Sequence, residues 1–381
     1  MRIIICEDDD AKLMEIAAFI RDQGVPDKDV VAARTLVEFF SLADEGVDLC
    51  IIDIRIPAYE GAKAEQNGIA ILQRLVYLAG TGVKLLAISA YPEEFSEIRP
   101  KFEAGGCILA DYHDKNLWRG ALKTLLLQSA SKVRFDFLVF VALEKERAPY
   151  AEIIDTEGVP HTTEGISRFD FEINGRSGSV VLLPRMGLVD AAITASRCIQ
   201  LYSPRIVGMS GICGGFEQNA ELGQLLISEA AYEYQSGKWS TDGFTSEPYQ
   251  VPISEPLRAL VAHLVGDAGF CSELENGWRG ERPRTMSKPK LGPFTSGSAV
   301  IASAELMAQV AKWHRKVAGL DMEVYSIHRA AHLASCRPDV LCAKVVVDLA
   351  NKEKDDRLHD YGSYVSAKFM IATLQEYFSG K

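Results

Sequence analysis

Short apolar runs alternate with longer amphipathic stretches along the first third of the chain. The apolar runs, each of a length typical of a buried strand, are residues 3–6, 30–33, 49–52 and 84–87. Apolar positions recur with helical spacing between these runs, as in 13–21 and 69–78. Strands separated by helical patterns predict a parallel sheet wound with helices.

The alternation resumes after a short segment of small and polar residues at 129–132. Further strands are predicted at 135–143, 179–184, 205–210 and 345–347, and further helices at 190–201, 303–319 and 361–378. The polar stretch 232–293, rich in glycine and proline, is expected to form loops. The chain is therefore predicted to be α/β throughout, with one domain at 1–130 and a second at 131–381.

Composition and charge narrow the class of protein. Of 381 residues, 48% are hydrophobic and 24% are charged, as in ordinary globular proteins. The formal charge of −11 comes without a basic block, so binding to nucleic acid is not expected. The 8 cysteines show no CxxC spacing, and the chain has neither a signal peptide nor an apolar run of about 18 residues. We expect a reduced, cytoplasmic protein without structural zinc and without contact to a membrane.

Acidic residues follow two predicted strands of the first domain. Glu7 and Asp8 come directly after 3–6, and Asp53 follows 49–52. The carboxyl ends of parallel strands meet at one edge of a sheet, so these side chains are expected to gather there. Gathered carboxylates repel one another unless a cation lies between them, and oxygen ligands suit Mg²⁺. The sequence therefore predicts a magnesium site formed by these three acids.

Two more residues at strand ends, Ser89 and Lys115, complete a set that resembles the receiver domain of two-component response regulators over about residues 1–128. The resemblance implies a flavodoxin-like fold in which Asp53 accepts a phosphoryl group from a sensor histidine kinase. It also implies that Ser89 and Lys115 contact the phosphoryl group and that Tyr112 is the switch aromatic.

The receiver pattern has two departures. The segment 58–67 is longer than the usual turn, and Asn116 stands where a proline is usual. Both departures touch the phosphorylation face. A degenerate receiver used only for dimerisation is therefore the alternative.

In the second domain, a run of valines at 345–347 stops at Asp348. Ligands of open α/β sheets bind beyond the carboxyl ends of strands, so Asp348 is a candidate for chemistry, with simple capping of the next helix as the alternative. A second candidate is the segment Gly-Ile-Cys-Gly-Gly at 211–215, whose glycines let a substrate approach the backbone. Its spacing is not GxGxxG, which disfavours a dinucleotide fold.

Five short motifs of the second domain resemble, in order, those of the nucleoside phosphorylase and nucleosidase superfamily. They are Ala-Leu-Glu-Lys-Glu at 142–146, Gly-Ile-Cys-Gly-Gly at 211–215, Ser-Gly-Ser at 296–298, Asp-Met-Glu at 321–323 and Val-Asp-Leu-Ala at 347–350. The resemblance implies a nucleoside phosphorylase-like α/β domain with a mixed central sheet. The first motif looks like that of the methylthioadenosine and adenosylhomocysteine nucleosidases, so water is the expected nucleophile and glycosidic cleavage needs no cofactor.

The same resemblance assigns a role to three carboxylates. Breaking a purine–ribose bond needs an acid for the leaving base, hydrogen bonds to the sugar hydroxyls and a group that orients water. By resemblance, Asp348 protonates the purine, Glu323 holds the ribose hydroxyls beneath Met322, and Glu146 positions and deprotonates water. The other expected substrate contacts are Gly211, Ile212, Cys213, Gly214, Val300 and Ile301. Ser298 stands where the family usually has an aspartate, and Val300 stands where its adenine-specific members often have an aromatic residue. The resemblance therefore predicts cleavage of an N-glycosidic bond more firmly than it predicts adenine as the base.

The fusion of the two domains resembles the effector response regulators of the Detocs antiphage defence system, which cleave ATP to adenine and ribose triphosphate. This resemblance implies an adenine nucleotide as substrate. A nucleotide needs positive charge beside the ribose 5′ end, where Arg147, Arg185 and Lys238 are candidates, although each could be a surface charge. Three alternatives stay open: a methylthioadenosine or adenosylhomocysteine nucleosidase, a purine nucleoside phosphorylase and a non-enzymatic nucleotide sensor. We expect a homo-oligomer, although no residue pattern defines it.

Overall fold

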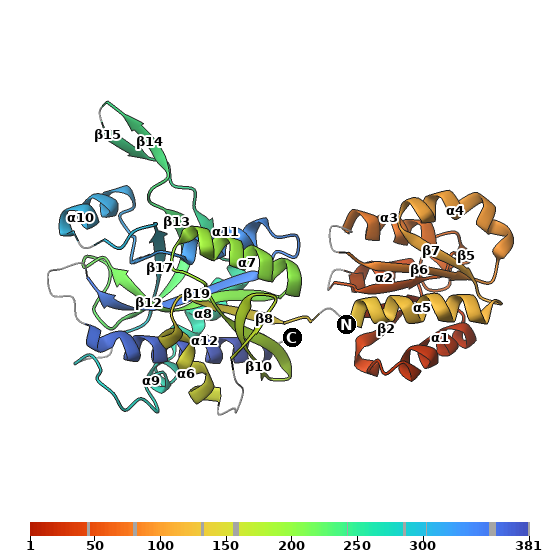
Figure 1. Cartoon of the computed structure of the whole chain (residues 1–381), viewed down its shortest axis with the longest axis horizontal. Coiled ribbons are helices and arrows are strands. Elements are labelled where there is room, and N and C mark those ends of the chain that lie inside the picture. The colour runs from red at the N-terminus through yellow and green to blue at the C-terminus, as the bar shows by residue number, and fades with distance from the viewer. Residues whose placement is uncertain are drawn as a thin grey trace. The chain divides into compact units, whose positions relative to one another are not determined.

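The computed structural model describes residues 1–43, 46–78, 82–130, 133–154, 160–241, 243–284, 287–301, 303–349 and 356–379. The chain divides into two compact units, Met1–Val133 and Arg134–Lys381, each described by itself below (Figure 1). No helix within these described ranges is long and apolar enough to cross a membrane.

The first unit is a five-stranded parallel sheet with helices on both faces. Its strands are β1 (Ile3–Cys6), β2 (Val30–Ala33), β3 (Leu49–Ile52), β6 (Lys84–Ser89) and β7 (Cys107–Asp111). Its helices are α1 (Asp10–Asp22), α2 (Leu36–Ala43), α3 (Gly68–Leu78), α4 (Phe95–Ala104) and α5 (Lys115–Ala130). The strand order β2-β1-β3-β6-β7 is the flavodoxin-like order, in which ligands bind where β1 and β3 diverge. The predicted parallel sheet and flavodoxin-like fold are confirmed.

Alternate residues of the strands enter two separate apolar clusters. In β1, Ile3 and Ile5 pack with α1 and α5, whereas Ile4 and Cys6 pack with α2, α3 and α4. Burial of each large apolar side chain contributes about 1.5–3 kcal/mol, so the alternation fixes which face each helix covers. The long segment noted after Pro57 contributes to a small hairpin of β4 (Ile56–Pro57) and β5 (Ala64–Glu65).

The second unit is built on a mixed ten-stranded sheet. The strands of this sheet are β8 (Phe137–Val141), β9 (His161–Thr163), β10 (Ile166–Ile173), β11 (Arg176–Leu182), β12 (Ile206–Gly215), β13 (Leu225–Glu233), β16 (Val251–Pro252), β17 (Lys290–Ser296), β18 (Gly319–Asp321) and β19 (Asp339–Asp348). β19 pairs with β12 in parallel and with β13 antiparallel, which confirms the mixed sheet. A separate hairpin of β14 (Gly237–Ser240) and β15 (Gly243–Ser246) projects from this unit (Figure 1).

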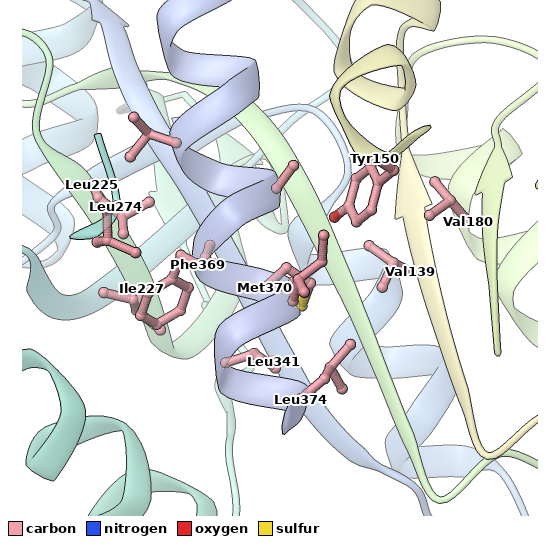
Figure 2. Packing of buried hydrophobic residues seen from close by; sticks show 14 of the residues in the cluster. Val139, Tyr150, Val180, Leu225, Ile227, Leu274, Leu341, Phe369, Met370 and Leu374 are labelled. Atoms are coloured by element: carbon pink, nitrogen blue, oxygen red, sulfur yellow. The ribbon is translucent and has the colours of Figure 1, made fainter. Parts of the chain in front are cut away.

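Helices cover both faces of this sheet. They are α6 (Glu144–Ile154), α7 (Leu188–Tyr202), α8 (Glu255–Gly266), α9 (Ala268–Glu273), α10 (Ala304–Trp313), α11 (Val324–Leu333) and α12 (His359–Ser379). One apolar cluster joins α6, α8 and α12 to the sheet, and another joins α7 and α11 to it. Figure 2 shows part of the first cluster, in which Phe369, Met370 and Leu374 of α12 pack with Val139 and Leu341 of the sheet.

The expectation of loops throughout 232–293 is wrong for α8 and α9. Ser254 caps α8 by accepting a hydrogen bond from the N–H of Leu257, and a proline occupies the first turn. Leu257, Val261 and Leu264 recur with helical spacing and are buried. Glycines and prolines on either side of α8 dominate the average composition of residues 232–293. A prediction from composition alone therefore misses the well-capped amphipathic helix within this stretch.

Candidate active site

Glu146 carries a buried carboxylate held by three backbone donors. It lies in the first turn of α6 and is 2% exposed. Its Oε2 accepts hydrogen bonds from the N–H groups of Ala142 (2.8 Å) and Leu143 (2.9 Å), and its Oε1 accepts one from Ile212 (3.0 Å). Burial raises the pKa of this carboxyl group, opposed by the Lys344 ammonium and the backbone donors. A carboxylate fixed in this way is suited to take a proton from water.

Gly211 leaves room for this carboxylate. Its φ of +135° lies in a region that other residues rarely adopt, and an added Cβ would lie 2.1 Å from Oε1 of Glu146. Its N–H donates a hydrogen bond to Oγ of Ser366 in α12 at 3.0 Å. Of the other glycine-segment residues, Cys213 is buried, whereas Ile212 and Gly214 are half-buried. All of them are part of β12, so a strand and not a loop forms this wall of the site.

Substitution of Gly211 by alanine is expected to lower kcat/KM for glycosidic cleavage about tenfold or more, because the methyl group must displace Glu146. The measurement compares initial rates of base release by the variant and the wild type. Gly266→Ala is the matched control, since an added Cβ there meets nothing within 4 Å. Equal rates for the two variants would mean that this close approach does not position Glu146.

A buried lysine joins two acids in the same region. Lys344 in β19 is 1% exposed, and its Nζ lies 2.7 Å from Oδ2 of Asp321 and 3.2 Å from Oε2 of Glu323. Burial lowers the pKa of this ammonium, but Asp321, Glu323 and Glu146 outweigh burial and hold the pKa well above its usual range. Lys344 is therefore charged, and it connects the three acids electrostatically.

The two acids that contact Lys344 differ in their other partners. Asp321 accepts hydrogen bonds from Oγ of Ser296 (2.6 Å) and from the N–H of Val324 (3.0 Å), so it orders the start of α11. Glu323 accepts a hydrogen bond through Oε1 from the N–H of Gly187 (3.0 Å), just before α7. Glu323 is buried, and the neighbouring Met322 is half-buried. Glu323 thus lies where α7, α11 and β19 meet.

Asp348 is the last residue of β19 and is half-buried. It follows Lys344 on the same strand, about 13 Å further along at the usual rise per residue. Its backbone pairs with Gly214 after a register shift in β12. Lys344 in β19, Glu323 at the start of α11 and Glu146 in α6 therefore form one buried cluster, and Asp348 lies beyond Lys344 at the carboxyl end of β19. Residue 350, the last of the motif Val-Asp-Leu-Ala at 347–350, and residues 351–355 after it lie outside the described residues.

The basic residues expected near a ribose 5′ end occupy three different surroundings. Arg147 is 7% exposed and donates hydrogen bonds to both carboxylate oxygens of Glu144 and to Oγ of Ser167. The guanidinium of Arg147 thus already binds side chains of the second unit. Lys238 is exposed on the projecting β14–β15 hairpin (Figure 1). Arg185 is exposed and lies two residues before Gly187, which makes it the candidate closest in sequence to a partner of Glu323.

The two predicted contacts after β17 also differ from each other. Val300 is 64% exposed, whereas Ile301 is 6% exposed. Ile301 packs in an apolar cluster with Phe216 and Tyr232. Ser298 is exposed, and its N–H donates a hydrogen bond to Gln235 at 2.8 Å. A role for Val300 and Ile301 in binding the base stays a prediction.

Comparison with known families identifies the second unit. The model of the phosphorylase superfamily matches residues 136–378. The chain belongs to this superfamily. Protein y4jS of Sinorhizobium fredii is 28% identical over 97% of this chain and 98% of its own length. The ATP nucleosidase Cap17 of Escherichia coli is 24% identical over 62% of this chain, and the match spans 50% of Cap17.

A solved structure shares the fold of the second unit. The 5′-methylthioadenosine/S-adenosylhomocysteine nucleosidase of Helicobacter pylori, crystallised with butyl-thio-DADMe-Immucillin-A, superposes with a TM-score of 0.53 at 16% identity. The likeness covers 64% of this chain and 99% of that one. The expected nucleoside phosphorylase-like fold is confirmed. Cap17 and the Helicobacter pylori protein are both named as nucleosidases, and the expectation of a purine N-glycosidase is confirmed.

Sequence reasoning missed Lys344 in this superfamily domain. The residue lies inside a run of cysteine, alanine and valine residues, so a buried strand must take its ammonium into the interior. A buried charge requires partners of opposite sign. A single lysine in an otherwise apolar predicted strand therefore indicates that acidic side chains lie beside that strand, here β19.

The first unit, outside the superfamily match, has its own cluster of acids. Carboxylate oxygens of Glu7, Asp8 and Asp53 lie within 4.8 Å of one another, and this donor set fits a hard divalent cation such as Mg²⁺. Burial raises the pKa of Glu7 to about 7, with the Lys12 ammonium opposing it and Asp53 adding to it. Burial also raises the pKa of Asp8.

The remaining receiver-type residues are only partly brought to Asp53. Ser89 is buried at the end of β6. The hydroxyl of Tyr112 donates to Oε2 of Glu15 at 2.5 Å, and Nζ of Lys115 donates to the same oxygen at 2.7 Å. Lys115 is thus paired with Glu15, and its contact with a phosphoryl group on Asp53 stays a prediction. The ammonium beside Asp53 belongs to Lys12, a residue that the resemblance did not single out.

Proposed function

We propose that the chain is a phosphorylation-regulated nucleosidase whose second unit hydrolyses the N-glycosidic bond of an adenine nucleotide, with ATP giving adenine and ribose 5′-triphosphate. The observation that carries the hydrolytic part is the buried cluster of Glu146, Glu323 and Lys344, with Asp348 beyond it on the same strand. Similarity to the ATP nucleosidase Cap17 supports ATP as the substrate. The exposed Arg185 supports a substrate with phosphate groups.

In the proposed reaction, Glu146 takes a proton from water while the water oxygen forms a bond to C1′ of the ribose. The bond between C1′ and N9 of the purine breaks, and its electron pair goes to the base. Asp348 donates a proton to N7 of the leaving base. Glu323 accepts hydrogen bonds from the ribose hydroxyls, and Lys344 holds Glu323 in place while its positive charge favours the ionised form of Glu146.

A nucleosidase for methylthioadenosine or adenosylhomocysteine is the second candidate, favoured by Met186. This side chain is 51% exposed and lies between Arg185 and Gly187. An apolar thioether at the ribose 5′ end would gain from contact with Met186, whereas a triphosphate would gain from Arg185. The two substrates therefore make different demands on adjacent residues.

For the first unit, we propose a receiver that accepts a phosphoryl group at Asp53 from a sensor histidine kinase. Glu7, Asp8 and Asp53 would hold Mg²⁺, which neutralises charge on the phosphoryl oxygens when bound. The support for this role is the flavodoxin-like order of strands together with the acids at the ends of β1 and β3. With a nucleotide-destroying second unit, the whole would act as a Detocs-type antiphage effector, in the cytoplasm and as a homo-oligomer.

Chromatographic detection of free adenine tests this proposal. The full chain is incubated with Mg²⁺ and either ATP or methylthioadenosine, with and without acetyl phosphate as a phosphodonor. We expect adenine from ATP and a rate that depends on the phosphodonor, and we expect Asp53→Ala to lose that dependence. Adenine from methylthioadenosine alone would instead establish the second candidate. If the reaction strictly required inorganic phosphate and the released sugar carried a phosphate group at C1′, the protein would be a phosphorylase.

A further inference from the structure

The acidic cluster of the first unit, Glu7, Asp8 and Asp53, is paired with a cation from its own chain. Lys12 is 4% exposed, and its Nζ lies 2.7 Å from Oε2 of Glu7 and 2.9 Å from Oδ2 of Asp53. The other oxygens of these acids accept backbone N–H groups, from Asp9 to Glu7 at 3.0 Å and from Arg55 to Asp53 at 3.4 Å. The ammonium thus lies on the two carboxylate oxygens that these backbone donors leave for a divalent cation.

Helix α1 fixes the backbone of Lys12 in this place. Oδ1 of Asp9 caps the helix by accepting a hydrogen bond from the N–H of Lys12 at 2.8 Å. Ile16 and Ile20 of the same helix are buried against the sheet. Because the helix is held at its start and along its apolar face, the ammonium can leave the two acids only by rotation of its own side chain.

A second lysine, Lys115 of the receiver-type set, pairs with a different acid. Nζ of Lys115 lies 2.7 Å from Oε2 of Glu15 and 3.6 Å from the centroid of the Tyr112 ring. Arg119 donates to the other oxygen of Glu15 at 2.9 Å. Glu15 of α1 therefore pairs with two cations of α5, and Lys12 is the ammonium that pairs with Glu7 and Asp53.

We propose that Lys12 is an internal counter-cation of this acidic cluster, and that a divalent cation binds Glu7, Asp8 and Asp53 only by displacing its ammonium. The inference rests on the magnesium site proposed for the first unit, and it names a residue that sets the affinity of that site. Two positive charges on the same carboxylate oxygens repel each other, so each weakens the binding of the other. Cation binding is thereby coupled to a side chain of α1, the helix whose Glu15 holds Tyr112 and Lys115.

Binding of Mn²⁺ to the full chain, followed by the loss of the electron paramagnetic resonance signal of free Mn²⁺, tests this proposal. Lys12→Met is expected to lower the Kd for Mn²⁺ about tenfold or more, because it removes the competing charge from two acids. The exposed Lys28 gives the matched control, and Lys28→Met is expected to change the Kd by less than about twofold. Lys12→Arg retains the charge and is expected to bind Mn²⁺ no more tightly than the wild type.

Several outcomes would overturn the role of Lys12. A Kd for Lys12→Met equal to or higher than that of the wild type would do so, as would a larger tightening by Lys115→Met. Should Lys12→Met not fold, tightening by Lys12→Arg would overturn the proposal and unchanged binding would support it. Asp53→Asn separates this proposal from the proposed receiver: if that variant binds Mn²⁺ as well as the wild type, the magnesium site itself fails. If Asp53→Asn weakens binding and Lys12→Met leaves it unchanged, only the role of Lys12 fails.

Discussion

Replacement of Glu146 by glutamine is expected to lower kcat/KM for glycosidic cleavage by about 10² to 10⁴, the usual contribution of a general base. The amide cannot accept the proton of the attacking water. It also fits its surroundings poorly, since one carboxylate oxygen accepts from Ile212 and the other from Ala142 and Leu143. Whichever way the amide is turned, its NH₂ group faces a backbone donor. The rate of adenine release at low substrate concentration gives kcat/KM directly.

Two controls separate chemistry from folding in this experiment. Glu152→Gln changes an exposed residue of the same helix, α6, and is expected to behave as the wild type. The melting temperature of Glu146→Gln shows how far the mismatched amide weakens the fold. A variant that releases adenine at more than about a tenth of the wild-type rate would remove Glu146 from the role of base.

The pKa of Glu146 adds an expected dependence on pH. The base must be ionised to accept a proton, and burial raises its pKa. The rate is therefore expected to fall as the pH is lowered through a value above about 4.3, the ordinary pKa of a glutamate. A pH profile of kcat/KM measures the position of this acidic limb. A limb at or below the ordinary value would show that Lys344 and the backbone donors outweigh burial.

Local patterns in the sequence were enough to predict most of the first unit. The strands β1, β2 and β3 begin and end where the apolar runs do, because each run is short and bounded by polar residues. In the second unit, β12 was expected to end at residue 210 but continues through the glycines to Gly215. Pairing with β19 and β18 holds these residues extended, and such long-range pairing overrides the low strand propensity of glycine.

The candidate sites show a similar limit. The acids of the first unit and Asp348 stand at strand ends, which the order of residues along the chain indicates directly, whereas Glu146 and Glu323 lie at the starts of α6 and α11. The lysine that reaches Asp53 was not predictable in this way, because Lys12 and Lys115 are both compatible with the sequence pattern. Glu15 decides between them by pairing with Lys115. That choice depends on side chains of α1 and α5 that meet only in the folded unit.

Lys344→Met is expected to lower the free energy of unfolding of the second unit by about 3–5 kcal/mol, because it leaves buried acids without their counter-charge. The melting temperature should fall by roughly 10 °C. Methionine keeps the length of the side chain, so the loss reports the charge and not a cavity. Lys312→Met, at an exposed position of α10, is the control and is expected to leave the melting temperature unchanged. Equal melting temperatures for both variants would contradict the electrostatic role of Lys344.

The dependence of this loss on pH distinguishes a charge effect from a packing effect. The pKa of Lys344 is raised in the folded unit, so its contribution to stability is fully present below about 10.4 and is lost only at higher pH. In the variant, the pKa of Glu146 should rise further, because Lys344 lowers it in the wild type. The folded variant then binds protons more readily than the unfolded chain, and its stability increases as the pH falls. The gap in melting temperature is therefore expected to narrow as the pH is lowered toward the ordinary pKa of a glutamate, about 4.3, whereas a packing defect would leave the gap constant.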